Sequence, residues 1–332
     1  MNAENIGVLA VHETHYNKAF VDRMHATFGS SIKVYHSEMP QREESAGGVA
    51  IILNKAKTKT DNIVEYELIP GRALMLVLPW HNTLKVAILA VYAPNDPTEN
   101  ANFWEEINDK TTGGEIPRPD IICTDANMVE EMIDRLPMHN DEAAQQAALD
   151  TMKHDMGMID GWRDRHPTMK AYTYHQKATG SQSHIDRIYV TEKILNASRG
   201  WEILETGIPT DHKLVSMELT DPQAPFVGPG RWPFPIYLAR NEKFLAEVED
   251  LGKKLLEDMD TLKFRRTNDE NPQTLWKTWR YKVRDLARKA AKRYRSPLQK
   301  EVDTLKVKRD GILNDPSLNE EEKMLAATVL QE

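Results

Sequence analysis

The sequence of 332 residues contains almost no cysteine and no long apolar run. Its single cysteine, Cys123, excludes an internal disulfide and a zinc site built from several cysteines. One cysteine also fits an intracellular, reducing compartment. Residues 1–5 are polar and unlike a secretory signal, and no apolar stretch approaches the roughly 20 residues of a membrane span. These features predict a globular intracellular protein.

Charge is distributed unevenly along the chain. The 43 Lys and Arg against 51 Asp and Glu give a net charge of -8. Residues 226–332 hold 22 of these cations and 18 of these anions, a net +4, so residues 1–225 carry -12. Ten cations fall within 277–300, where Asp285 is the only acid. The acidic part argues mildly against broad affinity for nucleic-acid phosphates, and the basic stretch is equally compatible with a solvated helix face and with nucleic-acid contact.

Periodic apolar residues predict alternating strands and helices in the first two thirds of the chain. Expected strands cover 6–13, 47–53, 63–69, 73–79, 84–92 and 120–124, with two more around 185–190 and 214–219. One expected helix has Phe20, Met24 and Phe28 on a common face, and two more cover 100–107 and 142–158. Closely spaced strands imply antiparallel pairing, and the intervening helices indicate an α/β sandwich. After residue 235 the spacing becomes helical, which predicts an all-α extension.

Side chains with catalytic or ligand chemistry stand at the ends of these strands. In chain order they are Glu13, Tyr92, Asp125, Asn127, Asp186, Asp211 and His212. Such oxygen ligands suit Mg²⁺, or Mn²⁺ as the alternative, and would not select zinc. Taken one at a time, each of these residues can have a structural role without catalysis, since Asp211 can cap a turn and His212 can be an ordinary surface histidine. Their joint occurrence favours a phosphodiesterase, because a cation, an imidazolium and a phenol stabilise the charge that in-line attack builds on phosphate.

Several short motifs share the order and spacing of a known family. They are V-H-E-T-H at 11–15, P-G-R-A-L at 70–74, V-Y-A-P-N-D-P at 91–97, T-D-A-N at 124–127, I-D-G-W-R at 159–163, S-Q-S-H-I-D-R-I-Y-V at 181–190 and T-D-H-K-L-V-S at 210–216. Together they resemble the endonuclease/exonuclease/phosphatase superfamily, and most closely the endonuclease domain of LINE-type (non-LTR) retrotransposons. The sequence G-P-G-R-W-P-F-P at 228–235 is similar to the linker that leads such domains towards a reverse transcriptase.

The resemblance implies a DNase I-like fold, a four-layer αββα sandwich. It divides the chain into an endonuclease-like domain over 1–222, a linker over 223–239 and a helical connector region over 240–332. The implied activity is Mg²⁺-dependent nicking of DNA that leaves a 3′-hydroxyl primer for target-primed reverse transcription, acting in the nucleus. Partners implied are DNA and, through the basic helix, element RNA. Candidate nucleic-acid contacts are Arg72, Lys277, Arg280, Arg284 and Arg288.

Roles in the site follow from the same resemblance. Glu13 would ligate the cation, and Asp211 would contact it directly or through water. Asp125 would orient or deprotonate the attacking water, with Asn127 fixing its position. His212 would lie against the scissile phosphate, hydrogen-bonded to Asp186. Tyr92 would donate to a phosphate oxygen.

An absent first strand and two substituted positions depart from the family pattern. The sequence starts after the family's first strand, which supplies an asparagine to the metal site, so we expect an incomplete metal site and weak nicking. Thr124 stands where the family usually has glycine, and His12 where it usually has glutamine. Two alternatives therefore remain: a catalytically impaired retrotransposon remnant, and a cellular repair nuclease or phosphatase of the same fold.

Overall fold

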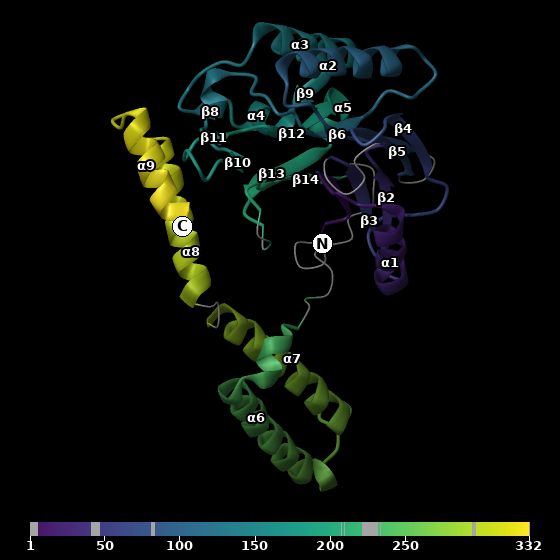
Figure 1. The fold of residues 1–332 in the computed structure, drawn as a ribbon. Helices are drawn as coiled ribbons and strands as arrows, with labels where there is room; N and C mark the ends of the chain where they lie inside the picture. The colour runs from purple at the N-terminus through teal and green to yellow at the C-terminus, as the bar shows by residue number, and fades with distance from the viewer. Residues whose placement is uncertain are drawn as a thin grey trace. The chain divides into compact units, whose positions relative to one another are not determined.

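The computed structural model describes residues 6–40, 47–80, 84–206, 208, 210–220, 232, 234–293 and 297–331 (Figure 1). The chain divides into two compact units, of which the first combines Met1–Ala224 with Arg309–Glu332 and the second is Pro225–Lys308. The second unit is therefore an insertion within the sequence of the first. These boundaries differ from those expected from the sequence, which assigned the whole of 240–332 to one helical region. The difference arises because Leu313 and Ala327 pack into the core of the first unit.

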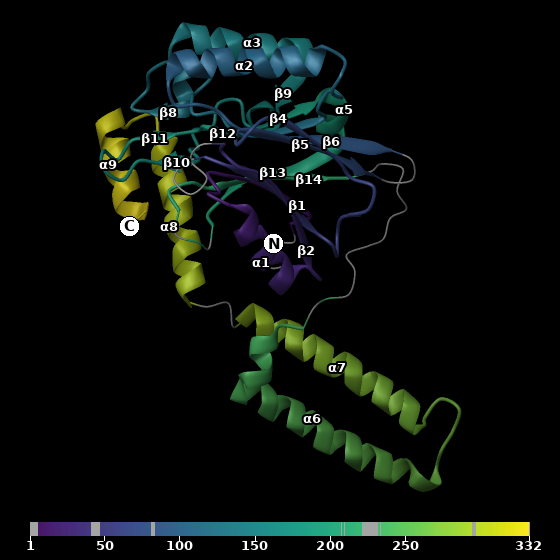
Figure 2. The same cartoon turned by 45° about the vertical axis from the view of Figure 1, so that its right-hand side comes forward.

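The larger sheet of the first unit has the strand order β4-β5-β6-β7-β12-β9. Its strands are β4 Val64–Ile69, β5 Ala73–Pro79, β6 Lys85–Tyr92, β7 Ile121–Asp125, β9 Met158–Asp160 and β12 Asp186–Thr191. The pairing is antiparallel except between β6 and β7, which are parallel. Parallel neighbours need a crossover, and α2, Pro97–Thr112, supplies it. Figures 1 and 2 show α2 and α3, Ala143–Met156, covering the outer face of this sheet.

A second layer of strands lies against the inner face of the larger sheet. It contains a three-stranded sheet of order β1-β3-β2 and a two-stranded sheet of β13 and β14. The strands are β1 Val8–His12, β2 Ile32–Ser37, β3 Val49–Asn54, β13 Ser198–Leu204 and β14 Leu214–Leu219. Helix α1, Lys18–Phe28, covers the outside of β2 and β3.

Three apolar clusters separate these layers. The first joins Trp104 of α2 to Met75 of β5, and the second joins Leu74 of β5 to Ile51 of β3. The third joins Ile52 of β3 to α1. Successive side chains of a strand point to opposite faces, so β5 and β3 each contribute to two clusters. The layers therefore follow in the order helices, sheet, sheet and helix, which confirms the expected αββα sandwich.

Short elements complete the first unit. They are η1 Met132–Asp134, β8 Arg135–Leu136, α4 Gly161–Arg165, β10 Tyr174–His175, β11 Gln182–Ser183, α5 Glu192–Asn196 and α9 Glu320–Gln331. Strands β10, β11 and β8 pair in that order as a small antiparallel sheet. This sheet lies beside the ends of β7 and β12, where the candidate catalytic residues occur.

The second unit is helical, as expected for the extension. Its elements are η2 Ile236–Arg240, α6 Glu242–Thr261, η3 Leu262–Phe264, α7 Pro272–Arg293 and the first part of α8 Pro297–Leu313. Helices α6 and α7 pack through Phe244, Ala287 and Ala290. The single helix expected over 277–300 is divided between α7 and α8, and residues 294–296 lie outside the described residues. None of the described helices combines the length and apolar character that crossing a membrane requires.

Candidate active site

The strand register aligns three of the candidate residues in one row. Tyr92 at the end of β6 is the register partner of Asp125 at the end of parallel β7. Asp125 is in turn the partner of Asp186, the first residue of antiparallel β12. Because side chains at paired positions share a face of the sheet, the phenol and the two carboxylates gather at one sheet edge. The convergence expected from the sequence is therefore present for these residues.

Glu13 reaches the same edge from the other sheet. It follows β1 with a left-handed backbone, φ 49°. Two backbone bonds hold this turn: Thr14 N donates to Gly48 O at 3.2 Å and His15 N donates to Gly47 O at 3.2 Å. The Tyr92 hydroxyl donates to the Glu13 carboxylate. A non-glycine residue in this conformation costs of order 1–3 kcal/mol, a cost that is common at functional sites.

Asp186 and His212 form a hydrogen-bonded pair, as expected from the sequence. The distance from His212 Nδ1 to Asp186 Oδ2 is 2.9 Å. Burial by itself lowers the pKa of His212, but the hydrogen bond and charge of Asp186, with Asp125 and Asp211, raise it to about 9. The imidazole is therefore charged at neutral pH. Its ring also lies against Tyr174, with ring centroids 4.9 Å apart.

Asp125 is the most buried of the candidate carboxylates, with 4% of its surface exposed. Burial, followed by the charge of Asp186, raises its pKa to about 7. Asn127 N donates to Asp125 Oδ1 at 3.1 Å, and the Asn127 side chain donates to Ala93 O at 2.8 Å. Asn127 has φ 49°, a left-handed value that asparagine tolerates better than most residues. The turn after β7 thus holds Asn127 beside the carboxylate.

Tyr92 is arranged as a hydrogen-bond donor. Burial and the bond to Glu13 raise the pKa of its hydroxyl well above the usual value, so the phenol keeps its proton. The Arg72 guanidinium lies 5.3 Å from the Tyr92 ring centroid, and Arg72 Nη1 donates to Tyr92 O at 3.2 Å. Arg72 is therefore beside the site. Lys277, Arg280, Arg284 and Arg288 lie exposed on α7 in the second unit.

One group of described side chains could hold a cation. Ligand atoms of Asp125, Asp186 and His212 all lie within 4.8 Å of one another. His212 Nδ1 is engaged by Asp186 and its imidazole is charged, so the carboxylate oxygens are the better ligands, and they suit Mg²⁺. Glu13 is close enough to influence the pKa of Asp125, whereas Asp211 is exposed. This grouping differs from the ligand pair Glu13 and Asp211 that the resemblance implied.

The two unusual neighbours of the site fit without disturbing the sheet. His12 Nε2 lies 3.3 Å from Cys123 O, and burial lowers the pKa of His12, which leaves a neutral ring able to donate. Thr124 is 1% exposed, and its hydroxyl has no hydrogen-bond partner among the described residues. It occupies the face of β7 opposite to Asp125, so its bulk does not enter the site.

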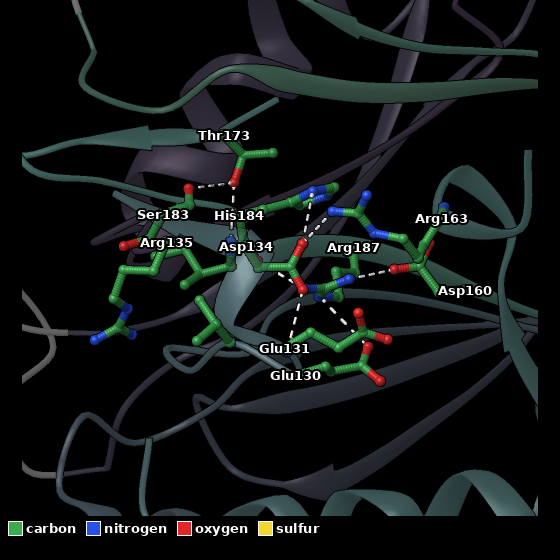
Figure 3. A network of polar contacts seen from close by, with 12 residues as sticks. Glu130, Glu131, Asp134, Arg135, Asp160, Arg163, Thr173, Ser183, His184 and Arg187 are labelled. Carbon is green, nitrogen blue, oxygen red and sulfur yellow. Dashed lines mark hydrogen bonds and ion pairs between the residues drawn. The ribbon is translucent and has the colours of Figure 1, made fainter. Parts of the chain in front are cut away.

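A buried ion network behind β12 was not foreseen from the sequence. Arg187, fully buried and next to Asp186, pairs with Asp134 at 2.7 Å and also with Asp160 and Glu130 (Figure 3). The pairing residues come from three separate segments of the chain, so no local motif predicts the network. Thr173 was missed as well, although its hydroxyl accepts hydrogen bonds from the backbone of Ile185 and Asp186 at 3.1 and 3.0 Å.

Comparisons with known proteins agree on the fold. No family model matches the chain. A curated relative, the transposon TX1 uncharacterized 149 kDa protein of Xenopus laevis, is 27% identical over 186 residues, which is 55% of this chain. The match spans about one seventh of that relative, 14% of its length.

Two solved structures cover the first unit. An AP endonuclease from Leishmania major has a TM-score of 0.53 at 16% identity, over 67% of this chain and 80% of its own. A 3′-5′ exonuclease from Neisseria meningitidis has a TM-score of 0.51 at 17% identity, over 66% of this chain and 91% of its own. Such low identities establish the fold only. The chain therefore has the fold of these two nucleases, the DNase I-like αββα sandwich that its sequence motifs indicated.

Proposed function

We propose that the first unit is a divalent-metal-dependent phosphodiesterase that nicks DNA. The observation that carries this proposal is the Asp186–His212 pair, which keeps an imidazolium beside the buried Asp125 carboxylate. The pairing of a cationic ring with a carboxylate whose pKa is near 7 supplies one group to neutralise phosphate charge and one to accept a proton. The nuclease fold and the similarity to a transposon protein support DNA as the substrate.

Each residue has a role in attack by water on a backbone phosphate. Asp125 takes a proton from the water, and Asn127 fixes the position of that water. His212 lies against the phosphate with Asp186 behind it. The Tyr92 phenol donates to an oxygen of the phosphate. Water attacks phosphorus while the bond to the 3′ oxygen breaks, so the products are a 5′ phosphate and a 3′ hydroxyl.

The carboxylates of this site suit a bound Mg²⁺ or Mn²⁺, which Asp125 and Asp186 would hold, while Glu13 and Asp211, the pair that the resemblance implied, would complete its coordination. When bound, such a cation supplies positive charge for the phosphate and for the leaving oxygen. The electrostatics of the site also favour it, because several carboxylates converge at the same sheet edge and burial and like charge raise the pKa of Asp125. A divalent cation there would offset the repulsion between the carboxylates.

Supercoiled plasmid offers a direct test of this activity. We expect the full chain with Mg²⁺ to convert supercoiled DNA slowly to open circles, in line with the weak nicking expected from the sequence. Asp125→Asn and His212→Ala should each lower the rate ~10²-fold or more, because general-base and charge-stabilising groups contribute at that level. Asp61→Asn, an exposed aspartate outside the site, is the matched control and should retain the rate. Equal residual nicking by all four proteins would support a catalytically impaired remnant instead.

The 3′ hydroxyl at the nick would serve as a primer for target-primed reverse transcription, which places the action at nuclear DNA. The similarity to a transposon protein supports this use. A DNA polymerase should extend the nicked plasmid without further processing. An oligonucleotide with a single abasic site tests the repair alternative suggested by the AP endonuclease fold neighbour. Cleavage confined to the abasic site, with intact plasmid left untouched, would favour repair over priming.

The second unit contributes a nucleic-acid contact in this proposal. Lys277, Arg280, Arg284 and Arg288 recur at helical spacing on one exposed stripe of α7, which flanks the apolar face that packs on α6. Tyr281 lies within the stripe, half exposed, with the Arg284 guanidinium 4.8 Å from its ring centroid. A stripe of cations around an aromatic ring suits the phosphates and bases of DNA or element RNA.

Salt dependence distinguishes this contact from a merely solvated helix face. The double variant Arg280→Gln/Arg284→Gln should weaken binding of a single-stranded RNA and reduce the slope of log affinity against log salt by about 1.4. Lys282→Gln/Lys289→Gln removes the same charge from the side of α7 away from the stripe and is the matched control. Equal effects of the two double variants would mean that only net charge matters.

A further inference from the structure

The last 23 described residues, 309–331, pack on the first unit through a small apolar cluster. Leu313 at the end of α8 is 2% exposed and Ala327 in α9 is 0% exposed. They form one apolar cluster with Leu136 of β8 and with Tyr172, and Met324 packs against it. Residues 309–331 therefore belong to the first unit, although the preceding residues 225–308 form the other unit. We call residues 309–331 the C-terminal segment.

Hydrogen bonds from the C-terminal segment satisfy backbone groups of the first unit. Asn314 bonds both sides of Lys170, since Lys170 N donates to Asn314 Oδ1 at 2.9 Å and Asn314 Nδ2 donates to Lys170 O at 3.2 Å. Met138 N donates to Glu320 Oε2 at 2.8 Å. These bonds replace water on specific backbone atoms, so they fix one register of docking.

Helix α9 also lies against the turn between β10 and β11. Gly180 in this turn has a left-handed backbone, φ 74°. A Cβ at this position would lie 3.1 Å from Thr328 Oγ1 and 3.5 Å from Met324 Cγ, both in α9. The close approach of the helix therefore requires a glycine, and the helix limits movement of the turn.

Residues 172–174, between Lys170 and this turn, connect the C-terminal segment to the candidate catalytic pair. The Tyr172 ring packs in the cluster with Leu313. One residue later, the Thr173 hydroxyl accepts the bonds from the backbone of Ile185 and Asp186. The next ring, Tyr174, lies 4.9 Å from His212. Three consecutive side chains thus touch the C-terminal segment, the backbone of Asp186 and the His212 imidazole.

We propose that the C-terminal segment positions the Asp186–His212 pair by holding residues 172–174, and that Leu313 and Asn314 are positioning residues for the reaction. The proposal rests on the phosphodiesterase function proposed above. The reason is geometric: a displacement of about 1 Å in a catalytic group can cost ~10²-fold in rate, and residues 172–174 contact the C-terminal segment at one end and the pair at the other. A residue far from the phosphate would then control turnover.

The test compares variants of the full chain. Leu313→Ala removes the buried contact, and Asn314→Ala, at an exposed position, removes the two bonds to Lys170 with less risk to folding. Leu325→Ala, 70% exposed on α9, is the matched control. Nicking is measured well below each melting temperature. We expect kcat to fall ~10-fold for the first two variants with KM for plasmid unchanged, and Leu313→Met to restore it.

Amide hydrogen exchange provides a readout that does not need activity. We expect exchange at Ile185 and Asp186 to accelerate at least 10-fold in Asn314→Ala, while exchange in β5 and β6 stays as in the wild type. Unchanged exchange at these amides would overturn the proposal whatever the activity, as would an unchanged kcat in a wild-type background that nicks. If the wild type does not nick but exchange responds as expected, the phosphodiesterase function fails while the positioning contact stands.

Discussion

Replacing Asp186 by asparagine tests the electrostatic basis of the site. The pKa of His212 is about 9 against an ordinary 6.5, even though burial opposes the charged form. At 1.36 kcal/mol for each pH unit, this difference corresponds to ~3 kcal/mol in favour of the imidazolium. Asp186 supplies the hydrogen bond and the nearest charge, whereas Asp125 and Asp211 act through charge alone. We therefore expect Asp186→Asn to lower the pKa of His212 by about 2 units.

The assay is an NMR titration of the imidazole signals between about pH 5 and pH 10 without metal ion, a range that spans both the ordinary and the raised pKa. Asp211→Asn is a matched control, because Asp211 is exposed and makes the smaller contribution. A His212 pKa that stays near 9 in Asp186→Asn would refute the assignment of the charge to this pair. A fall of similar size in both variants would show that the whole acidic cluster, and not the hydrogen bond, maintains the imidazolium.

The same pair makes stability depend on pH. A histidine whose pKa is raised by folding stabilises the native state fully below its unfolded pKa of about 6.5 and loses this contribution as pH rises through 9. The free energy of unfolding of the metal-free wild type should therefore decrease between these values. Urea denaturation of Asp186→Asn should show a smaller decrease over the same range. An equal decrease in both proteins would contradict the linkage.

Three further predictions concern the network, the phenol and the cation. Arg187→Met removes the cation shared by Asp134, Asp160 and Glu130 and should lower the free energy of unfolding in urea by ~3–5 kcal/mol. A loss below about 1 kcal/mol would show that the ion pairs left to Asp134 with Arg163 and to Glu130 with Lys153 are sufficient. Tyr92→Phe should lower the nicking rate ~10²-fold with an unchanged melting temperature, whereas an unchanged rate would remove the phenol from the reaction. Mg²⁺ binding, measured by calorimetry, should strengthen as pH rises through about 7, since Asp125 must lose its proton first, and chelation should stop nicking. Affinity that is constant over this range would place the ion away from Asp125.

The sequence predicted the layers well where apolar runs are long. The strands expected at 47–53, 73–79 and 84–92 correspond to β3, β5 and β6 within a few residues. These strands are buried on both faces, so nearly every position is apolar and the signal is strong. Strands β2 and β13 were not predicted because they are half exposed and carry polar residues throughout. Their place in the sheet is decided by their partners, β3 and β14.

The residues of the candidate site were predictable, but the supports of the site were not. Asp125 and Asp186 stand at the ends of strands that the apolar pattern predicts, so the sequence alone indicates them as site residues. The docking of Leu313 and the pairing of Arg187 with Asp134 join segments that are far apart in the chain. Such contacts leave no periodic or local pattern in the sequence, because nothing near Leu313 or Arg187 in the chain indicates its distant partner. The division of the chain at residue 309 could not be predicted for the same reason.

One carboxylate, Asp186, raises the pKa of two neighbours, one of which is an acid and the other a base. Its negative charge adds to burial in raising the pKa of Asp125 to about 7, which makes that carboxylate a stronger base near neutral pH. The same charge and a hydrogen bond raise the pKa of His212 to about 9, which keeps the imidazole cationic. A base and a cation are thereby available together over the interval between these two values. Because strand register places Asp186 opposite Asp125 and Thr173 holds its backbone, the geometry of the fold determines this interval.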